Sequence, residues 1–234
     1  MGAYEIVRLI IVFVFMVVIL AKLIARLFFK NNPMTTRFIA RTAVFAAISI
    51  ILYTVPFLKF SLPIFPAFLE IHLDEIPALM AGFAYGPLSG LLVILVKTVV
   101  KLPLTGTAGV GELADFIYSA VFVIPAAFIY KKHRTIKGAL ISLLVATVVQ
   151  VTVSSFVTTF VMLDMYSILY NLPKAAILGM CQKINPAITD LGFPFLLMVA
   201  LPFNALKDAI VVVVTFILYK RLRLLFKKIE AQKN

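Results

Sequence analysis

Long apolar runs constrain the fold of this chain more than any other feature. The clearest run extends from Phe193 to Leu218, and it exceeds the roughly 20 apolar residues that a helix needs to cross a bilayer. Hydrophobic residues make up 63% of the 234 residues and charged residues only 14%, whereas soluble domains carry about 25% charged residues. The sequence therefore predicts an all-α integral membrane protein.

The same run contains a polar island, in which Asn204, Lys207 and Asp208 fall within an arc of about 100° on a 3.6-residue helix. Such groups are costly inside a membrane, face the interior of the bundle and mark functional sites. Two interpretations follow. The island forms one wall of a small-molecule pocket, or Lys207 makes a charge pair with Asp208 or Glu112 that only holds helices together.

Further apolar segments divide the rest of the chain. We expect membrane helices over residues 36–57, 76–85, 88–102, 113–130, 138–163 and 193–218. Basic clusters such as Lys131–Arg134 alternate with these segments, and the positive-inside rule places the C-terminus in the cytoplasm. The same rule accounts for the formal net charge of +12, so nucleic acid is not an expected partner.

One more apolar segment, residues 5–29, precedes the six. We favour an extra N-terminal hydrophobic helix that crosses the bilayer, and a helix lying on the membrane surface is the alternative. The expected organisation is an extra helix and turn over residues 1–33, a six-helix membrane domain over residues 34–228, and a cytoplasmic tail over residues 229–234.

Polar groups near the predicted outer face converge on one place. Apolar and aromatic walls with a few placed polar groups describe a pocket for a small molecule with a flat ring. These polar groups come from four segments of the chain: Asp74, Glu75, Lys97, Lys101, Gly111, Glu112, Asn204 and Lys207.

Catalytic and metal-binding patterns are absent from the sequence. It contains no His-Glu-x-x-His or Gly-x-Ser-x-Gly motif, and one cysteine with two histidines argues against a structural zinc or iron–sulfur site. We therefore expect a protein that is not an enzyme and has no cofactor.

Small residues recur at four-residue spacing in the segment 36–57. Ala43 and Ala47, with Ala40 before them, permit close approach of another helix. They serve either packing inside the bundle or docking to the helices of a partner protein.

Several short motifs occur together in a characteristic order. They are Leu73-Asp74-Glu75-Ile76-Pro77, Tyr85-Gly86-Pro87, Gly109-Val110-Gly111-Glu112-Leu113 and Pro202-Phe203-Asn204-Ala205-Leu206-Lys207. In order and spacing the chain resembles, over about residues 36–225, the riboflavin-uptake S components of energy-coupling factor (ECF) vitamin transporters.

The resemblance implies a six-helix S-component bundle in the prokaryotic plasma membrane that binds riboflavin, as the transported ligand, near its outer face. Family members place ligand contacts at positions that correspond here to Leu73, Asp74, Gly111, Glu112, Asn204 and Lys207. The resemblance further implies docking, through Ala43 and Ala47, to a transmembrane coupling protein that works with two ATPase subunits.

The chain departs from the family pattern at three places. An asparagine expected near the end of the fifth helix is missing from the stretch Thr159–Asp164, and His72 and Asp115 stand where neutral polar residues are more usual. Alternatives therefore stay open: an S component for another vitamin or flavin, a stand-alone ion-coupled secondary transporter with Glu112 and Asp208 as relay residues, or an intramembrane enzyme.

Overall fold

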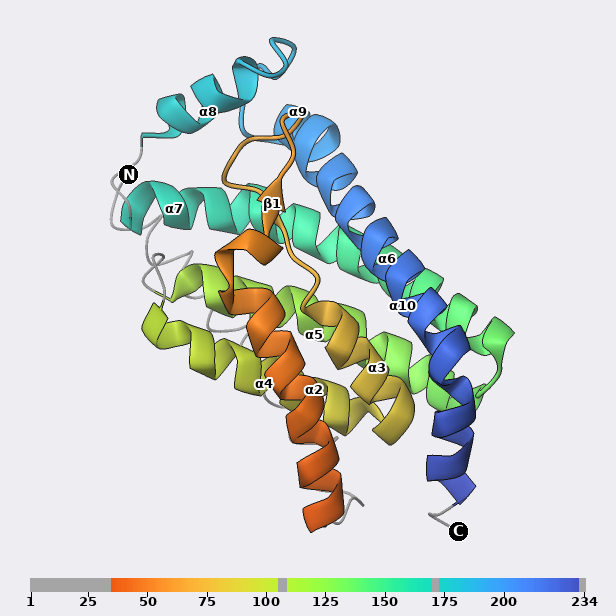
Figure 1. The fold of residues 1–234 in the computed structure, drawn as a ribbon. Helices are drawn as coiled ribbons and strands as arrows, with labels where there is room; N and C mark the ends of the chain where they lie inside the picture. The colour runs from red at the N-terminus through yellow and green to blue at the C-terminus, as the bar shows by residue number, and fades with distance from the viewer. Residues whose placement is uncertain (1–34, 105–108, 170–172, 232–234) are drawn as a thin grey trace.

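A computed structural model describes residues 35–104, 109–169 and 173–231, which form a bundle of tilted helices (Figure 1). The predicted helix within residues 1–33 lies outside the described residues. In chain order the elements are α2 (Thr36–Thr54), η1 (Pro56–Leu58), β1 (Phe60–Ser61), β2 (Glu70–Ile71), α3 (Glu75–Tyr85), α4 (Pro87–Lys101), η2 (Leu102–Leu104), α5 (Val110–Lys132), α6 (Ile136–Val157), η3 (Thr158–Met162), α7 (Leu163–Leu169), α8 (Lys174–Gln182), α9 (Phe193–Phe195), η4 (Leu196–Ala200) and α10 (Leu201–Ala231).

Five helical stretches of the described chain are long and apolar enough to cross a membrane. They are Thr36–Thr54, Pro87–Leu104, Val110–Lys132, Ile136–Ile168 and Phe193–Arg223. The predicted all-α membrane fold is therefore confirmed. The sixth expected helix, α3, has 11 residues and spans only about 16 Å, roughly half the thickness of the hydrocarbon core.

Local sequence sets the ends of these helices. The Thr35 side chain accepts a hydrogen bond from the amide of Phe38 and caps α2, and Pro56 follows directly after its C-cap. Gly86, with φ of 100°, makes the turn between α3 and α4, because a residue without Cβ adopts this conformation at low cost.

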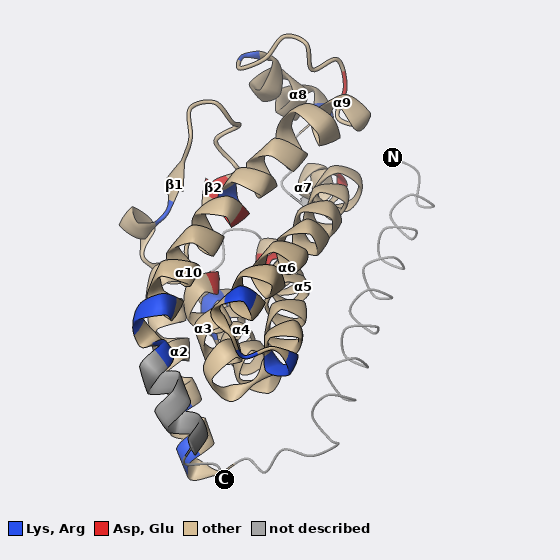
Figure 2. Cartoon of the chain, turned by 90° about the vertical axis from the view of Figure 1, so that its right-hand side faces the viewer, with Lys and Arg blue, Asp and Glu red and all other residues tan. Residues whose placement is uncertain are grey.

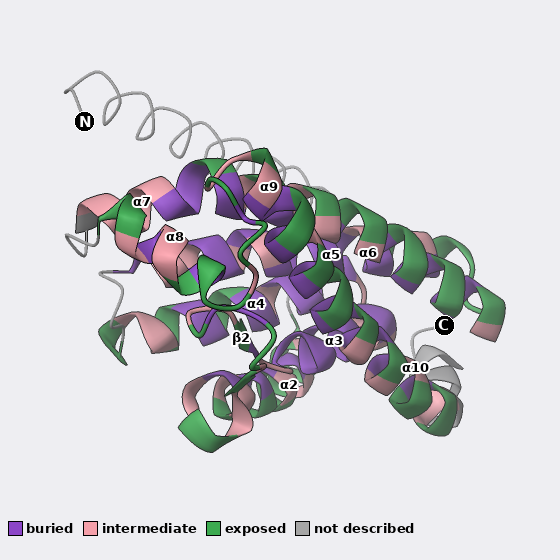
Figure 3. Ribbon diagram, turned by 90° about the horizontal axis from the view of Figure 1, so that it is seen from above, coloured by how far each residue is buried: buried purple, intermediate pink, exposed green. Residues whose placement is uncertain are grey.

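The short helix α3 lies at the centre of the bundle. Every residue from Glu75 to Phe83 is buried, and Figure 3 shows α3 as an almost unbroken buried segment among the other helices. Close packing around it depends on Gly90 of α4, where an added Cβ would lie 2.9 Å from the carbonyl oxygen of Ala78 and 2.6 Å from Cγ1 of Val123. Because α3 begins at Glu75, directly after Asp74, its buried position brings two acidic residues into the interior of the bundle.

Two long helices are interrupted by π turns, η3 and η4, which contact each other. Pro202 follows η4 and cannot donate to the carbonyl four residues earlier, which favours the wider turn. In η3 the Thr159 hydroxyl donates to the carbonyl of Ser155 at 2.8 Å, so a side chain competes with the backbone for that acceptor. π turns of this kind recur at functional sites.

Two long connectors lie between predicted helices, residues 58–72 and residues 164–192, and both contain more structure than the sequence indicated. Within residues 58–72, β1 pairs antiparallel with β2, with Phe60 opposite Ile71. The segment 164–192, where the sequence predicted no membrane helix, continues α6 through η3 as α7 and then forms α8. Together with α9, these connectors gather at one end of the bundle, away from the C-terminal end of α10 (Figure 1).

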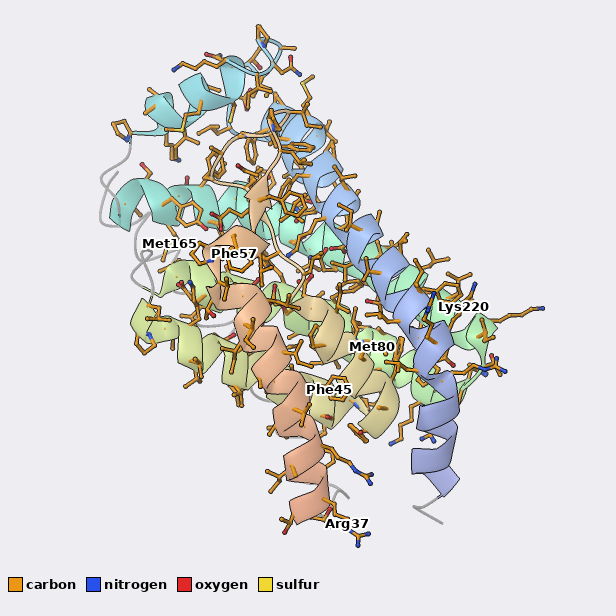
Figure 4. All side chains as sticks on the ribbon, viewed as in Figure 1. Arg37, Phe45, Phe57, Met80, Met165 and Lys220 are labelled. Carbon is orange, nitrogen blue, oxygen red and sulfur yellow. The ribbon has the colours of Figure 1, made fainter. Side chains whose placement is uncertain are left out.

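Many basic residues lie at one end of the bundle. Figure 2 shows them toward the end where α10 finishes, whereas further basic residues near β1 and α8 and the coloured acidic residues lie away from it. Arg37 and Phe57 mark opposite ends of the α2 segment (Figure 4).

Candidate functional site

A cavity of about 280 Å³ lies at the connector end of the bundle, close to the lower end of the range for small-molecule sites. Residues from α2, the β1–β2 connector, α4, α5, η3, α7, η4 and α10 line it. The lining residues are Tyr53, Lys59, Phe68, Leu69, Glu70, His72, Lys101, Gly111, Glu112, Ala114, Asp115, Tyr118, Thr158, Met162, Tyr166, Ala200, Phe203, Asn204 and Lys207.

Aromatic side chains form much of the cavity wall. Tyr53, Phe68, Tyr118, Tyr166 and Phe203 come from five different parts of the chain. Flat apolar faces of this kind pack well against a planar ring system. A planar heterocycle is therefore the ligand shape that these walls suit best.

Four of the six residues predicted to contact substrate line this cavity. Gly111 and Glu112 lie in the first turn of α5, and Asn204 and Lys207 lie one turn apart on α10. Glu112 is 4% exposed and Lys207 is also 4% exposed, so a ligand there would meet charged groups largely shielded from water. Such groups interact more strongly than they would in solvent.

The π turns place Asn204 beside the cavity. Its amide nitrogen donates to the hydroxyl of Ser155 at 3.1 Å and to the carbonyl of Ala200 at 2.9 Å. Both acceptors lie at or next to η3 and η4. The amide is therefore held in one orientation by the two interrupted helices.

Lys207 pairs with a carboxylate that sequence spacing did not indicate. Its ammonium lies 3.3 Å from Oε1 of Glu75, which stands 132 positions earlier in the chain, and it also interacts electrostatically with the Asp208 considered above. The same Glu75 oxygen accepts from Ser119 at 3.2 Å. Lys207 therefore lines the cavity while its ammonium pairs with a carboxylate of the buried core.

The other two predicted contacts, Leu73 and Asp74, do not line the cavity. Leu73 packs partly buried against the central hydrophobic cluster. Asp74 is fully buried, and it pairs with Lys97 and with His72. Burial alone favours the neutral acid, but the Lys97 ammonium holds the pKa of Asp74 well below its usual range.

Lys97 is the hub of a buried ion-pair network behind the cavity wall. Its ammonium lies 2.8 Å from Oδ2 of Asp115 and donates to Ser119 at 3.0 Å, in addition to pairing with Asp74. His72, Asp74 and Asp115 offer ligand atoms within 4.8 Å of one another. Both carboxylates already face the Lys97 ammonium, so the cluster is better described as a buried ion-pair network than as a metal site.

Sequence reasoning missed several lining residues. Tyr53, Tyr118 and Tyr166 gave no signal because single tyrosines in apolar helices are common. Thr158 did belong to a polar stripe with Gln150 and Ser154, and its hydroxyl lies 3.0 Å from that of Tyr118. Asp164, which ends the stretch lacking the expected asparagine, pairs with Lys174 of α8 instead.

The small residues proposed for docking lie on the outer side of α2. Ala43 and Ala47 are exposed, and so are Val44 and Ile48, at 60% and 45%. Helix α2 also has the smallest buried share among the five apolar stretches. A ridge of small and branched side chains on this helix is therefore not covered by the other described helices.

The fold and the cavity together define a membrane-embedded ligand-binding protein. The model of the family described as "ECF transporter, substrate-specific component" matches residues 37–219, and this chain therefore belongs to that family.

Relatives of known name support the same assignment. The riboflavin transporter RibU of Staphylococcus aureus (strain TCH60) is 31% identical over 189 residues, which cover 81% of this chain and 93% of the relative. The riboflavin transporter FmnP of Bacillus subtilis (strain 168) is 29% identical and covers 79% and 93%. A solved S component of a bacterial ECF transporter superposes with a TM-score of 0.63 at 28% identity, covering 82% of this chain and 98% of that one.

Proposed function

We propose that this chain captures riboflavin in the cavity between α5, η3 and α10. The observation that carries the proposal is the convergence of Gly111, Glu112, Asn204 and Lys207 on one aromatic-walled cavity, in a chain whose named relatives are riboflavin transporters. The aromatic walls suit the flavin ring, while amide, ammonium and carboxylate groups suit its carbonyls, N–H groups and hydroxyls.

Transport then requires partners that this chain lacks. We propose that the chain captures riboflavin at the outer face, with its C-terminus in the cytoplasm, and docks to an ECF coupling protein that works with two ATPase subunits. The exposed ridge around Ala43 and Ala47 supports this part of the proposal, because small residues let a partner helix approach closely. Leu73 and Asp74 then act behind the wall of the cavity rather than at its surface.

Riboflavin binding by the purified protein tests the proposal. Quenching of riboflavin fluorescence should saturate at one ligand per chain, and thiamine should not compete. A protein that leaves riboflavin fluorescence unchanged at micromolar concentration would refute the assignment of the ligand. Unchanged binding after replacing sodium with choline would count against an ion-coupled transporter.

Lys207→Met tests the site within that assay. A hydrogen bond from an ammonium to a ligand carbonyl contributes roughly 1.5–3 kcal/mol, so the dissociation constant should rise by about tenfold to 150-fold. Lys220→Met is the matched control, because this lysine is exposed on the same helix and should leave affinity unchanged. The double variant Glu75→Gln with Lys207→Met removes both charges of the buried pair. Recovery of full affinity in the double variant would show that Lys207 only supports the fold.

A further inference from the structure

Asp208 is a buried acid that the proposed site does not use. It follows Lys207 directly on α10, and its side chain is 0% exposed. Neither of its carboxylate oxygens has a hydrogen-bond partner among the described residues. A buried carboxyl group in this state needs either a proton or a partner.

The charged groups around Asp208 are few. Helices α3 and α6 and the π turn η4 pack against α10. Within the described chain η4 carries no charged residue and α6 carries only Lys137, near its first turn. The charged residue contributed by α3 is Glu75, which interacts electrostatically with Asp208. Lys207, on α10 itself, completes the set.

Only one of the two carboxylate oxygens of Glu75 has a hydrogen-bond partner among the described residues. Oε1 faces the ammonium of Lys207 and the hydroxyl of Ser119, whereas Oε2 is buried without a partner among the described residues. Ser119 is tied in turn to Lys97, whose charge is already opposed by Asp74 and Asp115. Lys97 also interacts electrostatically with Glu75, but its ammonium lies against Asp74 and Asp115, so Lys207 is the cation that pairs directly with Glu75.

The number of charges indicates how many protons Glu75 and Asp208 hold between them. One ammonium, Lys207, faces two buried carboxyl groups, Glu75 and Asp208. Two like charges in a site of low polarity are strongly disfavoured, and such pairs hold one proton between them. Glu75 already accepts hydrogen bonds from Lys207 and Ser119, whereas neither oxygen of Asp208 has a hydrogen-bond partner among the described residues, so we place the proton on Asp208.

We propose that Asp208 is held as a neutral carboxylic acid and donates its O–H to the open oxygen of Glu75, which makes it a positioning residue for Lys207. The inference rests on the proposed function, because its consequence concerns ligand binding. When the Lys207 ammonium turns toward a ligand in the cavity, Glu75 loses one donor. The Asp208 hydroxyl then keeps the Glu75 carboxylate solvated inside the bundle.

The sign of the pH dependence follows from this arrangement. The proton on Asp208 is present at low pH and is lost as the pH rises. Without it, two carboxylates compete for Lys207 and hold the ammonium away from the cavity. Ligand affinity is therefore expected to fall as the pH is raised through the range in which Asp208 ionises.

Infrared spectroscopy of the ligand-free protein in nanodiscs tests the protonation state. The carbonyl stretch of a protonated carboxylic acid is separate from that of a carboxylate. At pH 7 the difference spectrum between the native protein and Asp208→Asn should contain one protonated-acid band. Absence of this band from the difference spectrum would overturn the proposal. A protonated-acid band that disappears in Glu75→Gln and persists in Asp208→Asn would also overturn it, because the proton would then lie on Glu75.

Riboflavin titration across the pH range from weakly acidic to alkaline tests the positioning role. Asp208→Asn keeps a donor of the same size, so its affinity should stay within about threefold of native and lose its pH dependence. Asp208→Ala removes the donor and should bind about tenfold more weakly or worse. An alanine variant that folds and binds like native protein would overturn the positioning role. If native protein shows the acid band but binds no riboflavin, the proposed function fails and the positioning role fails with it, whereas the protonation state stands.

Discussion

Replacing Lys97 with methionine should destabilise the fold strongly, although Lys97 does not line the cavity. Its side chain is fully buried and opposes both Asp74 and Asp115. Removing one partner from a buried ion pair costs about 3–5 kcal/mol, and here two carboxylates lose the same cation, so we expect the upper end. For a chain of this length, about 5 kcal/mol lowers the melting temperature by roughly 10–20 °C.

The protein carries its own reporter for this measurement. Cys181 is the only cysteine in the sequence, its side chain is 0% exposed, and burial raises the pKa of its thiol to about 11. The thiol is therefore inaccessible and mostly protonated at neutral pH. A thiol-reactive fluorophore should label the native protein slowly and the unfolded protein fast, so fluorescence during a heating scan reports unfolding.

Two controls make the prediction sharp. Lys101→Met removes the same charge one turn further along α4, from a half-buried position, and should shift the melting temperature by only a few degrees. The triple variant Lys97→Met, Asp74→Asn and Asp115→Asn removes the uncompensated charges and should recover much of the loss. A Lys97→Met protein that melts within a few degrees of native, or a triple variant no more stable than the single one, would refute the role of the network.

Two further predictions concern the cavity and the central packing. Asn204→Ala removes the amide held by the π turns and should weaken riboflavin binding by about tenfold, as measured by fluorescence quenching. Gly90→Ala places a Cβ 2.6 Å from Val123 and 2.9 Å from the Ala78 carbonyl, so it should cost about 1–3 kcal/mol of stability. Gly179→Ala, where an added Cβ meets nothing within 4 Å, should not lower the melting temperature; if both alanine variants melt alike, the packing argument is wrong.

The position of most helices could be predicted from the sequence, because apolar runs long enough to cross a bilayer leave few alternatives. The predicted segment 36–57 corresponds to α2, which ends earlier, at Thr54, because Pro56 follows. The segment 138–163 corresponds to α6, which continues through η3 into α7. Helix α8 was missed because its nine residues lie among prolines and asparagines and carry no long apolar run.

Part of the site was also predictable. Asn204 and Lys207 stood out because polar groups in an apolar span are rare, and both line the cavity. Their partners were not predictable, because sequence spacing defines the face of a helix but not its rotation relative to other helices. Glu75 meets Lys207 only after α3 and α10 pack together. The same limit hid the network of Lys97 and Asp115.

The π turn η4 has a consequence for any variant that changes the length of α10. Each α-helical residue turns the chain by about 100°, and a π turn absorbs one additional residue. The residues before Leu196 and those after Ala200 therefore follow two different angular phases. A helical wheel drawn over residues 193–218 superposes these phases and blurs the boundary between the lipid-facing and inward-facing sides. Deleting one residue within η4 would remove the absorbed residue and let the helix continue as a regular α-helix with Asn204 still facing Ser155. Deleting one residue between η4 and Asn204 would instead rotate Asn204 by about 100° away from Ser155, so that every side chain of the cavity is present but one wall is misaligned.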